Sequence, residues 1–366
     1  NTRLGEAHFL RAYAYFELAL HYCKNYDPAS AGSDYGIPLV TEYAPSSDYS
    51  KYPGRSSLKE TFDFIVKDLE QASNLVGIQG EAQSAYITLD VVEALKARVY
   101  LEMEDYQNAA AAAQGLINSK RYTLISDGDA YKKMWLNDVG TEAIWQFAMS
   151  KTETGSNALG SSFMGIVDKL PRPSYLPVKS VLNLYDKEND IRYDAYFTTG
   201  LIDRQVGDDI EVTYCSKWPG NPELYEGKSN NVNKLKAFRI SEMYLIAAEA
   251  YAMLNQEDKA SEMLNELKKI RIKGWTETVY NGAALMQEIQ DERVRELFAE
   301  GNRLFDMKRW KIGMKRSSSD AQRDDYLPAL GTDIEKEATD NRWVWPIPKD
   351  EMDSNPQLKG QQNPGY

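Results

Sequence analysis

Tyrosine and tryptophan side chains in loop-like stretches are the residues of this sequence best suited to bind a ligand. A flat ring can stack on the C–H face of a sugar, while neighbouring Asn, Asp, Arg or Lys side chains bond its hydroxyls. The chain contains 24 Tyr and 7 Trp against 10 Phe, so rings with a polar edge predominate. Such rings suit half-exposed surfaces and interfaces, and this composition indicates a binding protein.

The candidate rings fall in two stretches of the chain. Tyr49 and Tyr52 belong to the first, where they are bordered by Asp48, Lys51 and Arg55. The second is longer and contains Tyr175, Tyr196, Trp218 and Tyr225, with Asn221, Asn230 and Asn231 nearby in sequence. A packing role is the alternative for every one of these rings. Trp218 is the most ambiguous, because it directly precedes Pro219.

Catalysis is the alternative chemistry to consider. Two carboxylates about 5 to 10 Å apart could hydrolyse a glycosidic bond, and 55 acidic residues leave such a pair open. Only two histidines occur, His8 and His21, and no Cys/His cluster has zinc spacing. Cys23 and Cys215 lie far apart, so a disulfide is open but not indicated. We therefore expect no enzyme, no cofactor and no metal site.

Charge and length narrow the class of protein further. The 366 residues carry a formal net charge of −12, which disfavours nucleic acid as a partner. Uronic-acid-rich or sulfated ligands are disfavoured for the same reason, although a local basic loop could reverse this. No run of 18 apolar residues is present, and the chain begins Asn-Thr-Arg. We expect a chain that is N-terminally incomplete.

Apolar periodicity predicts mostly helices. A helix is expected over residues 5–22, followed by a loop-like stretch over 24–57. Ser57 and Glu60 form a capping box before the next helix, and Asp90 is expected to cap another that ends near Met103. An alanine-rich helix follows over 106–118, and a further helix is expected over 282–300.

One helical hairpin occurs twice. Ala97, Tyr100, Ala109 and Leu116 match four residues at a constant offset of 151, namely Ala248, Tyr251, Ala260 and Leu267. The pattern resembles the tetratricopeptide helix pair, although Tyr106 aligns with Glu257. A loop-rich insertion over residues 125–236 separates the two copies, with a short strand expected near Ala143 to Phe147. An insertion of this length in a helical repeat is typically functional.

Several strings occur in a fixed order along the chain: EAHFLRAYAYF from Glu6, YGIPLV from Tyr35, an acidic turn with Asp186, Asp190 and Arg192, RISEMYLIAAEA from Arg239, ERVREL to DMKRW over 292–310, and WPIP to NPGY over 345–366. Together they resemble the SusD/RagB family of Bacteroidetes cell-surface nutrient-binding lipoproteins. Cys23 is expected in mid-helix and is not the lipid-bearing cysteine of that family.

The resemblance implies a mainly α fold of four tetratricopeptide-like helix pairs with a loop-rich insertion and a few short strands. The whole chain, 1–366, would be a single, N-terminally incomplete SusD-like domain. It would divide into first helical repeats (1–124), the insertion (125–236), second helical repeats (237–310) and an irregular C-terminal segment (311–366).

The resemblance also implies a function. Such proteins lie on the outer membrane, cover a SusC-like TonB-dependent transporter and capture glycans or other nutrients for import. The membrane would be reached only through an N-terminal lipid anchor absent from this chain. We therefore expect an oligosaccharide-binding subunit without catalysis. A peptide or other non-sugar ligand, a plain interaction scaffold and a hydrolase remain alternatives.

The charged residues of the matched strings are expected to be structural. Arg239, Glu242, Glu249, Glu292, Arg295 and Glu296 lie on expected helices, where ion pairs are the ordinary reason for such residues. Trp310 and Trp345 have apolar or proline neighbours and are expected to be packing anchors.

Overall fold

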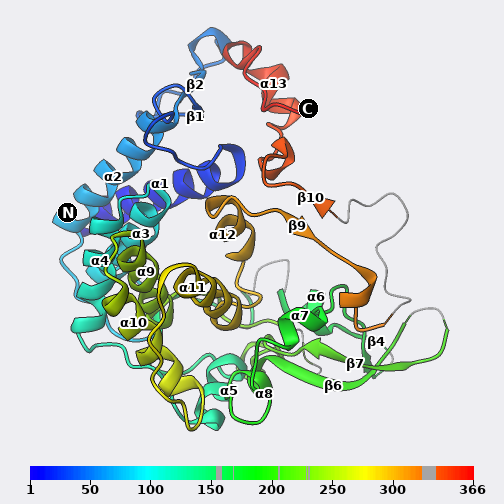
Figure 1. Cartoon of the computed structure of the whole chain (residues 1–366). Helices are drawn as coiled ribbons and strands as arrows, with labels where there is room; N and C mark the ends of the chain where they lie inside the picture. Colours follow the sequence, from blue (N-terminus) through cyan, green and yellow to red (C-terminus); the bar gives the residue numbers. More distant parts are fainter. Residues whose placement is uncertain (154–158, 168, 205–206, 228, 230, 324–334) are drawn as a thin grey trace.

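A stack of helices forms one side of the molecule (Figure 1). The computed structural model describes residues 1–153, 159–167, 169–204, 207–227, 229, 231–323 and 335–366. Within these residues, successive helices of the stack contact each other, and α4 contacts α9 although the whole insertion separates them in sequence. The stack consists of α1 (Thr2–Tyr22), α2 (Leu58–Leu75), α3 (Leu89–Glu102), α4 (Tyr106–Asn118), α9 (Ile240–Met253), α10 (Glu257–Arg271) and α11 (Gly282–Glu296).

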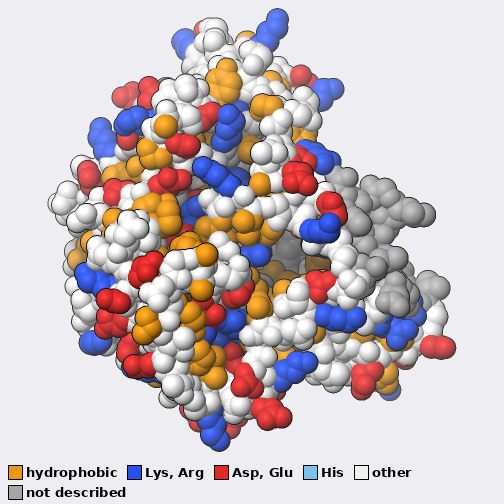
Figure 2. All heavy atoms as spheres, viewed as in Figure 1, with side chains coloured by type: hydrophobic (Ala, Val, Ile, Leu, Met, Phe, Trp, Pro, Cys, Tyr) orange, Lys and Arg blue, Asp and Glu red, His pale blue; other side chains and the backbone are white. Residues whose placement is uncertain are grey.

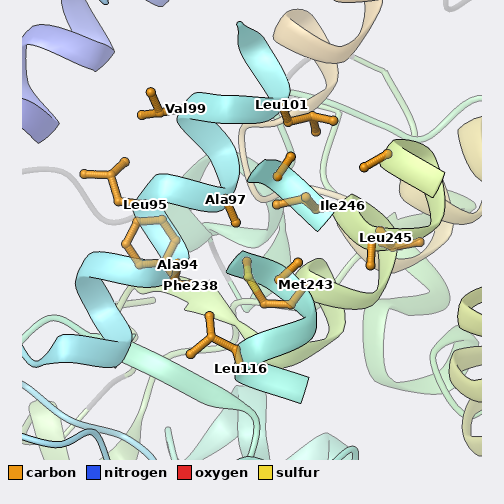
Figure 3. Packing of buried hydrophobic residues seen from close by; sticks show 14 of the residues in the cluster. Ala94, Leu95, Ala97, Val99, Leu101, Leu116, Phe238, Met243, Leu245 and Ile246 are labelled. Carbon is orange, nitrogen blue, oxygen red and sulfur yellow. The ribbon is translucent and has the colours of Figure 1, made fainter. Parts of the chain in front are cut away.

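The repeated hairpins pack through their small residues. Ala97, Ala109, Ala248 and Ala260 are all fully buried, and their lack of bulk lets the helix axes approach. Figure 3 shows side chains from α3, α4 and α9 meeting in the resulting core, among them Leu116 and Met243. The helical repeat predicted from the offset of 151 is confirmed as two helix pairs, α3 with α4 and α9 with α10.

One of the two predicted helix caps is present in the structure, and the other is not. Ser57 Oγ accepts a bond from the Glu60 amide at 3.1 Å, and the Glu60 carboxylate accepts one from the Ser57 amide at 2.8 Å, which confirms the capping box of α2. The cap predicted at Asp90 is wrong. Thr88 caps α3, and Asp90 lies inside the helix, where its buried carboxylate is bound by Arg121.

The insertion consists of short elements around a second hydrophobic core. The predicted strand is confirmed as β3 (Ala143–Gln146), which pairs antiparallel with β8 (Lys236–Arg239) and ties the insertion to the start of α9. A longer antiparallel hairpin projects from it (Figure 1). The other described elements are α5 (Gly128–Leu136), α6 (Leu159–Met164), β4 (Ile166–Val167), β5 (Leu170–Pro171), α7 (Lys179–Leu182), α8 (Tyr193–Tyr196), β6 (Phe197–Ile202), β7 (Ile210–Cys215) and the 3₁₀ helix η2 (Pro222–Leu224).

The C-terminal segment runs back against α1. The Trp345 amide donates to the carbonyl of His21 at 2.9 Å, and Arg55 Nη1 donates to Asn363 Oδ1 at 2.8 Å. These contacts join the chain end to the loop after α1. The remaining described elements are β1 (Tyr35–Pro38), η1 (Tyr49–Lys51), β2 (Arg55–Ser57), α12 (Arg303–Arg309), β9 (Met314–Lys315), η3 (Ser318–Asp320), β10 (Glu335–Lys336), η4 (Asn341–Trp343), α13 (Lys349–Ser354) and η5 (Pro356–Leu358).

A buried ion network connects the helical stack to the insertion. Glu296 on α11 accepts bonds from Arg192, Arg239 and Arg271, at distances between 2.9 and 3.1 Å. All four side chains are almost completely excluded from solvent. The predicted structural role of the charged landmark residues is confirmed, since Glu242, Glu249, Glu292 and Arg295 are also buried in ion pairs.

Two further observations concern the chain as a whole. Among the described helices, none combines the length and the apolar character that a membrane crossing requires. Cys23 and Cys215 are both buried free thiols, and burial raises the pKa of each to about 11. Cys23 directly follows the last residue of α1, rather than lying in mid-helix as expected.

Candidate functional site

The structure brings Tyr49 and Tyr52 together in the loop before β2. Their ring centres are 5.6 Å apart with the planes at 75°, and Tyr49 is 55% exposed. The Tyr52 hydroxyl donates to the Ser46 carbonyl at 3.0 Å, which leaves part of that ring covered. Asn355 fixes the loop from the C-terminal segment by donating to the Pro53 carbonyl.

Tyr175 and Tyr225 lie in the insertion. Tyr175 is 66% exposed and its ring centre is 6.4 Å from that of Phe163, whereas Tyr225 is half-buried. In Figure 1, β2 and β4, which neighbour the two exposed groups in sequence, lie at opposite ends of the view. The predicted rings therefore do not form one site. Asn221 and Asn231 are buried, and Asn230 lies outside the described residues.

Tyr196 and Trp218 are internal, which corrects their prediction as surface platforms. Tyr196 is fully buried and its hydroxyl bonds to Tyr131 and to the Glu296 carbonyl. Trp218 is 2% exposed, and its Nε1 donates to the Ala299 carbonyl at 3.2 Å. Their polar edges are thus satisfied inside the protein, so neither ring offers a free face to a sugar at the surface.

Tyr196 and Trp218 lie in an internal aromatic cluster that contains the buried residue Lys217. The Lys217 ammonium lies 3.9 Å from the ring centre of Tyr196 and 4.1 Å from that of Trp135, which in turn packs edge-on against Trp218 at 5.1 Å. Aromatic faces attract a desolvated cation. Of the two rings that sequence reasoning assigned to a ligand, Tyr196 faces the Lys217 ammonium, and Trp218 lies 5.7 Å from the ammonium of Lys236.

A cavity of about 390 Å³, here called the central cavity, lies between the helical stack and the insertion. Its walls come from α1, α3, β8, the start of α9, α12 and the connection between α11 and α12, together with Leu159 of α6. Figure 2 shows hydrophobic side chains gathered around a hollow near the centre of one face, beside the position of α12 in Figure 1. Its volume lies in the range of small-molecule binding sites.

Half-buried rings line the central cavity. Tyr13 of α1, Phe147 and Phe305 all border it, and each is partly exposed. Trp145 packs edge-on against two of these rings, with its ring centre 5.7 Å from that of Tyr13 and 4.7 Å from that of Phe147. At the rim, His21 lies between Phe305 and Trp345. Trp345 is 47% exposed, so the packing role predicted for it accounts for only part of its ring.

Polar groups that can donate and accept hydrogen bonds adjoin these rings. Burial, together with the Glu17 carboxylate, raises the pKa of the Tyr13 phenol to about 12, so the hydroxyl keeps its proton at neutral pH. Glu17, Glu102 and Asn302 also line the cavity, as does Arg293. Donors and acceptors beside ring faces are the combination that a polyhydroxylated ligand requires.

Sequence reasoning looked for binding rings in loops and missed this site, because several of its residues, Tyr13 and Phe305 among them, lie on helices. Tyr13, Glu17 and His21 recur at intervals of four, which places them on one face of α1, and that face borders the cavity. This polar and aromatic spacing was the available signal. Trp218 is the only predicted ring among the described lining residues.

Metal-dependent chemistry has no positive support in the described part of the chain. There, no three His, Cys, Asp or Glu side chains are grouped so that they could hold an ion.

Comparisons with sequence families match two segments of the chain. The SusD family matches residues 204–366, and a family described as starch-binding associating with outer membrane matches residues 2–101. SusD-like protein P38 of Formosa agariphila is 25% identical over 402 residues, which cover 97% of this chain and 73% of that protein.

Solved structures share the fold. A SusD superfamily protein from Bacteroides thetaiotaomicron superposes with a TM-score of 0.79 at 27% identity, covering 98% of this chain and 77% of that one. A SusD-like carbohydrate binding protein from Bacteroides vulgatus has a TM-score of 0.75 at 20% identity, with 98% and 77% covered. The predicted SusD/RagB resemblance and the mainly helical fold are both confirmed.

Proposed function

Because the chain is SusD-like in sequence and in fold, we propose that it is the oligosaccharide-binding subunit of an outer-membrane nutrient uptake complex and that its ligand occupies the central cavity. Its role would be capture without catalysis. Support comes from the description of the family that matches residues 2–101, which names starch binding and the outer membrane. One structure that shares the fold is described as carbohydrate binding.

The observation that carries the proposal is the composition of the cavity walls. Tyr13, Phe147 and Phe305 supply ring surface, while Glu17 and Asn302 supply groups that bond hydroxyls. If two or three rings each contribute about 0.5 to 1.5 kcal/mol beyond area burial, the affinity should be micromolar to millimolar. Affinity in this range suits capture followed by release to a transporter.

The partner and location follow from the same proposal. A SusC-like TonB-dependent transporter would accept the ligand, and a lipid anchor outside this sequence would hold the protein on the cell surface. The matched family is associated with the outer membrane, which supports this assignment.

Calorimetry with panels of oligosaccharides and peptides tests the proposal. We expect at least one oligosaccharide to bind, and Phe147→Ala to weaken that binding about tenfold, because it removes one ring from the cavity wall. Phe64→Ala, which removes a half-buried ring on α2 away from the cavity, is the matched control and should leave affinity unchanged.

Three results would contradict the proposal. Binding of peptides alone would reject the glycan assignment. Loss of affinity in Tyr175→Ala or Tyr49→Ala, with Phe147→Ala unaffected, would move the site to the exposed tyrosines. Release of new reducing ends from a polysaccharide would overturn the absence of catalysis.

A further inference from the structure

Carboxylates outnumber cations on the α1 side of the central cavity. Arg98 is bound by both oxygens of Glu242, with Nε to Oε1 at 2.6 Å and Nη2 to Oε2 at 2.7 Å. Burial lowers the pKa of Arg98, but Glu242 and then Glu17 raise it above its ordinary value, so Glu17 also lies in the field of this guanidinium. Among the described residues on this side, the Arg98 guanidinium is therefore the one cation close to the carboxylates of both Glu242 and Glu17.

The α12 side has no such excess among the described residues. Arg293 pairs with Asp306 at 2.8 Å, and Arg309 is shared by Asp306, Glu102 and Glu249. The Lys308 ammonium also acts on Glu102, so at least three described cations face these three carboxylates. The excess of carboxylate is therefore confined to the α1 side of the cavity.

The cations of the cavity floor are already committed to carboxylates. Lys236 pairs with Asp138 at 2.8 Å, both fully buried, and Arg239 pairs with Glu300 at 2.7 Å. Glu300 also accepts a bond from Lys217, but Lys217 is not among the described lining residues and lies against the rings of Trp135 and Tyr196. An anionic group entering the cavity beside α1 would meet the Glu17 carboxylate in surroundings that screen charge poorly.

One buried donor nevertheless lacks a partner. Nη1 of Arg293 is buried and makes no hydrogen bond to the described residues, although Arg293 lines the cavity. Its other nitrogens hold Asp306, which already neutralises the guanidinium. A donor whose charge is satisfied needs only an uncharged acceptor, such as a hydroxyl or carbonyl oxygen.

From this arrangement we infer that the central cavity selects uncharged oligosaccharides over uronate or sulfated ones. Glu17 excludes the anionic forms, and Arg293 Nη1 donates to a neutral ligand oxygen. The inference rests on the proposed function, since it concerns the ligand class of the same cavity.

Matched neutral and acidic ligands test the inference by calorimetry. Maltohexaose, cellohexaose and laminarihexaose would each be compared with its own form oxidised at C6 to the uronate. For whichever backbone binds, we expect the neutral form to bind at least about tenfold more tightly at low salt, with a smaller ratio at high salt. Equal or tighter binding of an oxidised form would overturn the inference and leave the proposed function standing. If no form of any backbone binds, both fall.

A variant on α1 separates charge from shape. Glu17→Gln keeps the size of the side chain while removing one negative charge. We expect it to reduce the preference for the neutral form several-fold without lowering the melting temperature. Glu6→Gln, on the same helix but outside the cavity lining, should leave the preference unchanged. An unchanged preference in Glu17→Gln would contradict the role assigned to Glu17.

Discussion

Lys217 shows how a single buried residue determines what its neighbours can do. Its ammonium donates to the Phe298 carbonyl and to Glu300, both at 2.7 Å, and two aromatic rings flank it. Burial lowers its pKa to about 8, although the nearby Glu300 acts in the opposite direction. The ordinary lysine pKa is 10.5, so the unfolded chain holds this proton more tightly than the native protein does.

This difference predicts a pH-dependent effect of Lys217→Met. The cost of burying the charge is fully present below pH 8 and disappears as the pH rises from 8 toward 10.5. The stability of Lys217→Met relative to the parent protein should therefore fall by about 1 kcal/mol between pH 7 and pH 9. Urea unfolding at the two pH values measures this change.

Exposed lysines provide the control. Lys132 is partly exposed and pairs weakly with Asp194 at 3.5 Å, so Lys132→Met should show no such dependence on pH. A stability difference between Lys217→Met and the parent protein that stays constant from pH 7 to pH 9 would refute the account of the buried ammonium.

Tyr196 and Trp218 show a limit of sequence reasoning. Tyr196 bonds to Glu296, which lies 100 positions away in sequence, and Trp218 bonds to Ala299, which lies 81 positions away. Loop composition favoured exposure for both rings, and local sequence held no sign of these distant bonds. By contrast, Tyr49 and Tyr175 are exposed as loop composition suggested, because the described structure places few groups over them.

At the scale of elements, local signals predicted the long helices well. The capping box of α2 depends on residues close in sequence, and so does the residue pattern within each of the two helical hairpins. Both predictions are confirmed. The short helix α12 was not predicted, because seven residues give too little periodicity to recognise. Asp90 was misassigned because a residue suited to capping was also suited to a buried ion pair.

Asp90→Asn distinguishes a cap from an ion pair. Asparagine caps helices as well as aspartate does, so a cap role predicts almost no change in stability. The structure instead predicts a loss of about 1 to 3 kcal/mol, because Arg121 and Tyr122 both donate to the buried carboxylate. Chemical denaturation gives the measurement.

Asp105→Asn is the matched control for this prediction. Asp105 is the cap of α4, where its carboxylate accepts from the Asn108 amide, so the substitution should be nearly neutral. Equal small effects in the two variants would show that Asp90 acts only at the helix terminus.

At the scale of the whole molecule, the ion network around Glu296 joins the helical stack to the insertion. Glu296 lies on α11, while its partners come from the insertion, the start of α9 and the end of α10. The landmark charges were predicted to be structural because they were expected on helices, where ion pairs are ordinary. Their shared partner was not, since Arg192 and Glu296 are far apart in sequence.

Glu296→Gln should therefore destabilise the molecule strongly. Removing this carboxylate takes one counter-charge from three buried guanidinium groups, and breaking a buried ion pair typically costs about 3 to 5 kcal/mol. Glu226→Gln breaks an exposed pair with Lys151 and should change stability by less than about 0.5 kcal/mol. Thermal and urea unfolding of both variants measure these changes. Similar losses of unfolding free energy in the two variants would contradict the structural role of Glu296.

The arrangement of helices and insertion also creates the central cavity, and a crystal structure with a bound oligosaccharide tests that assignment most directly. We predict a sugar in the cavity beside Phe147 and Phe305, with one of its oxygens within about 3 Å of Arg293 Nη1. A sugar bound instead at Tyr49 and Tyr52 or at Tyr175, with the central cavity empty, would contradict the account.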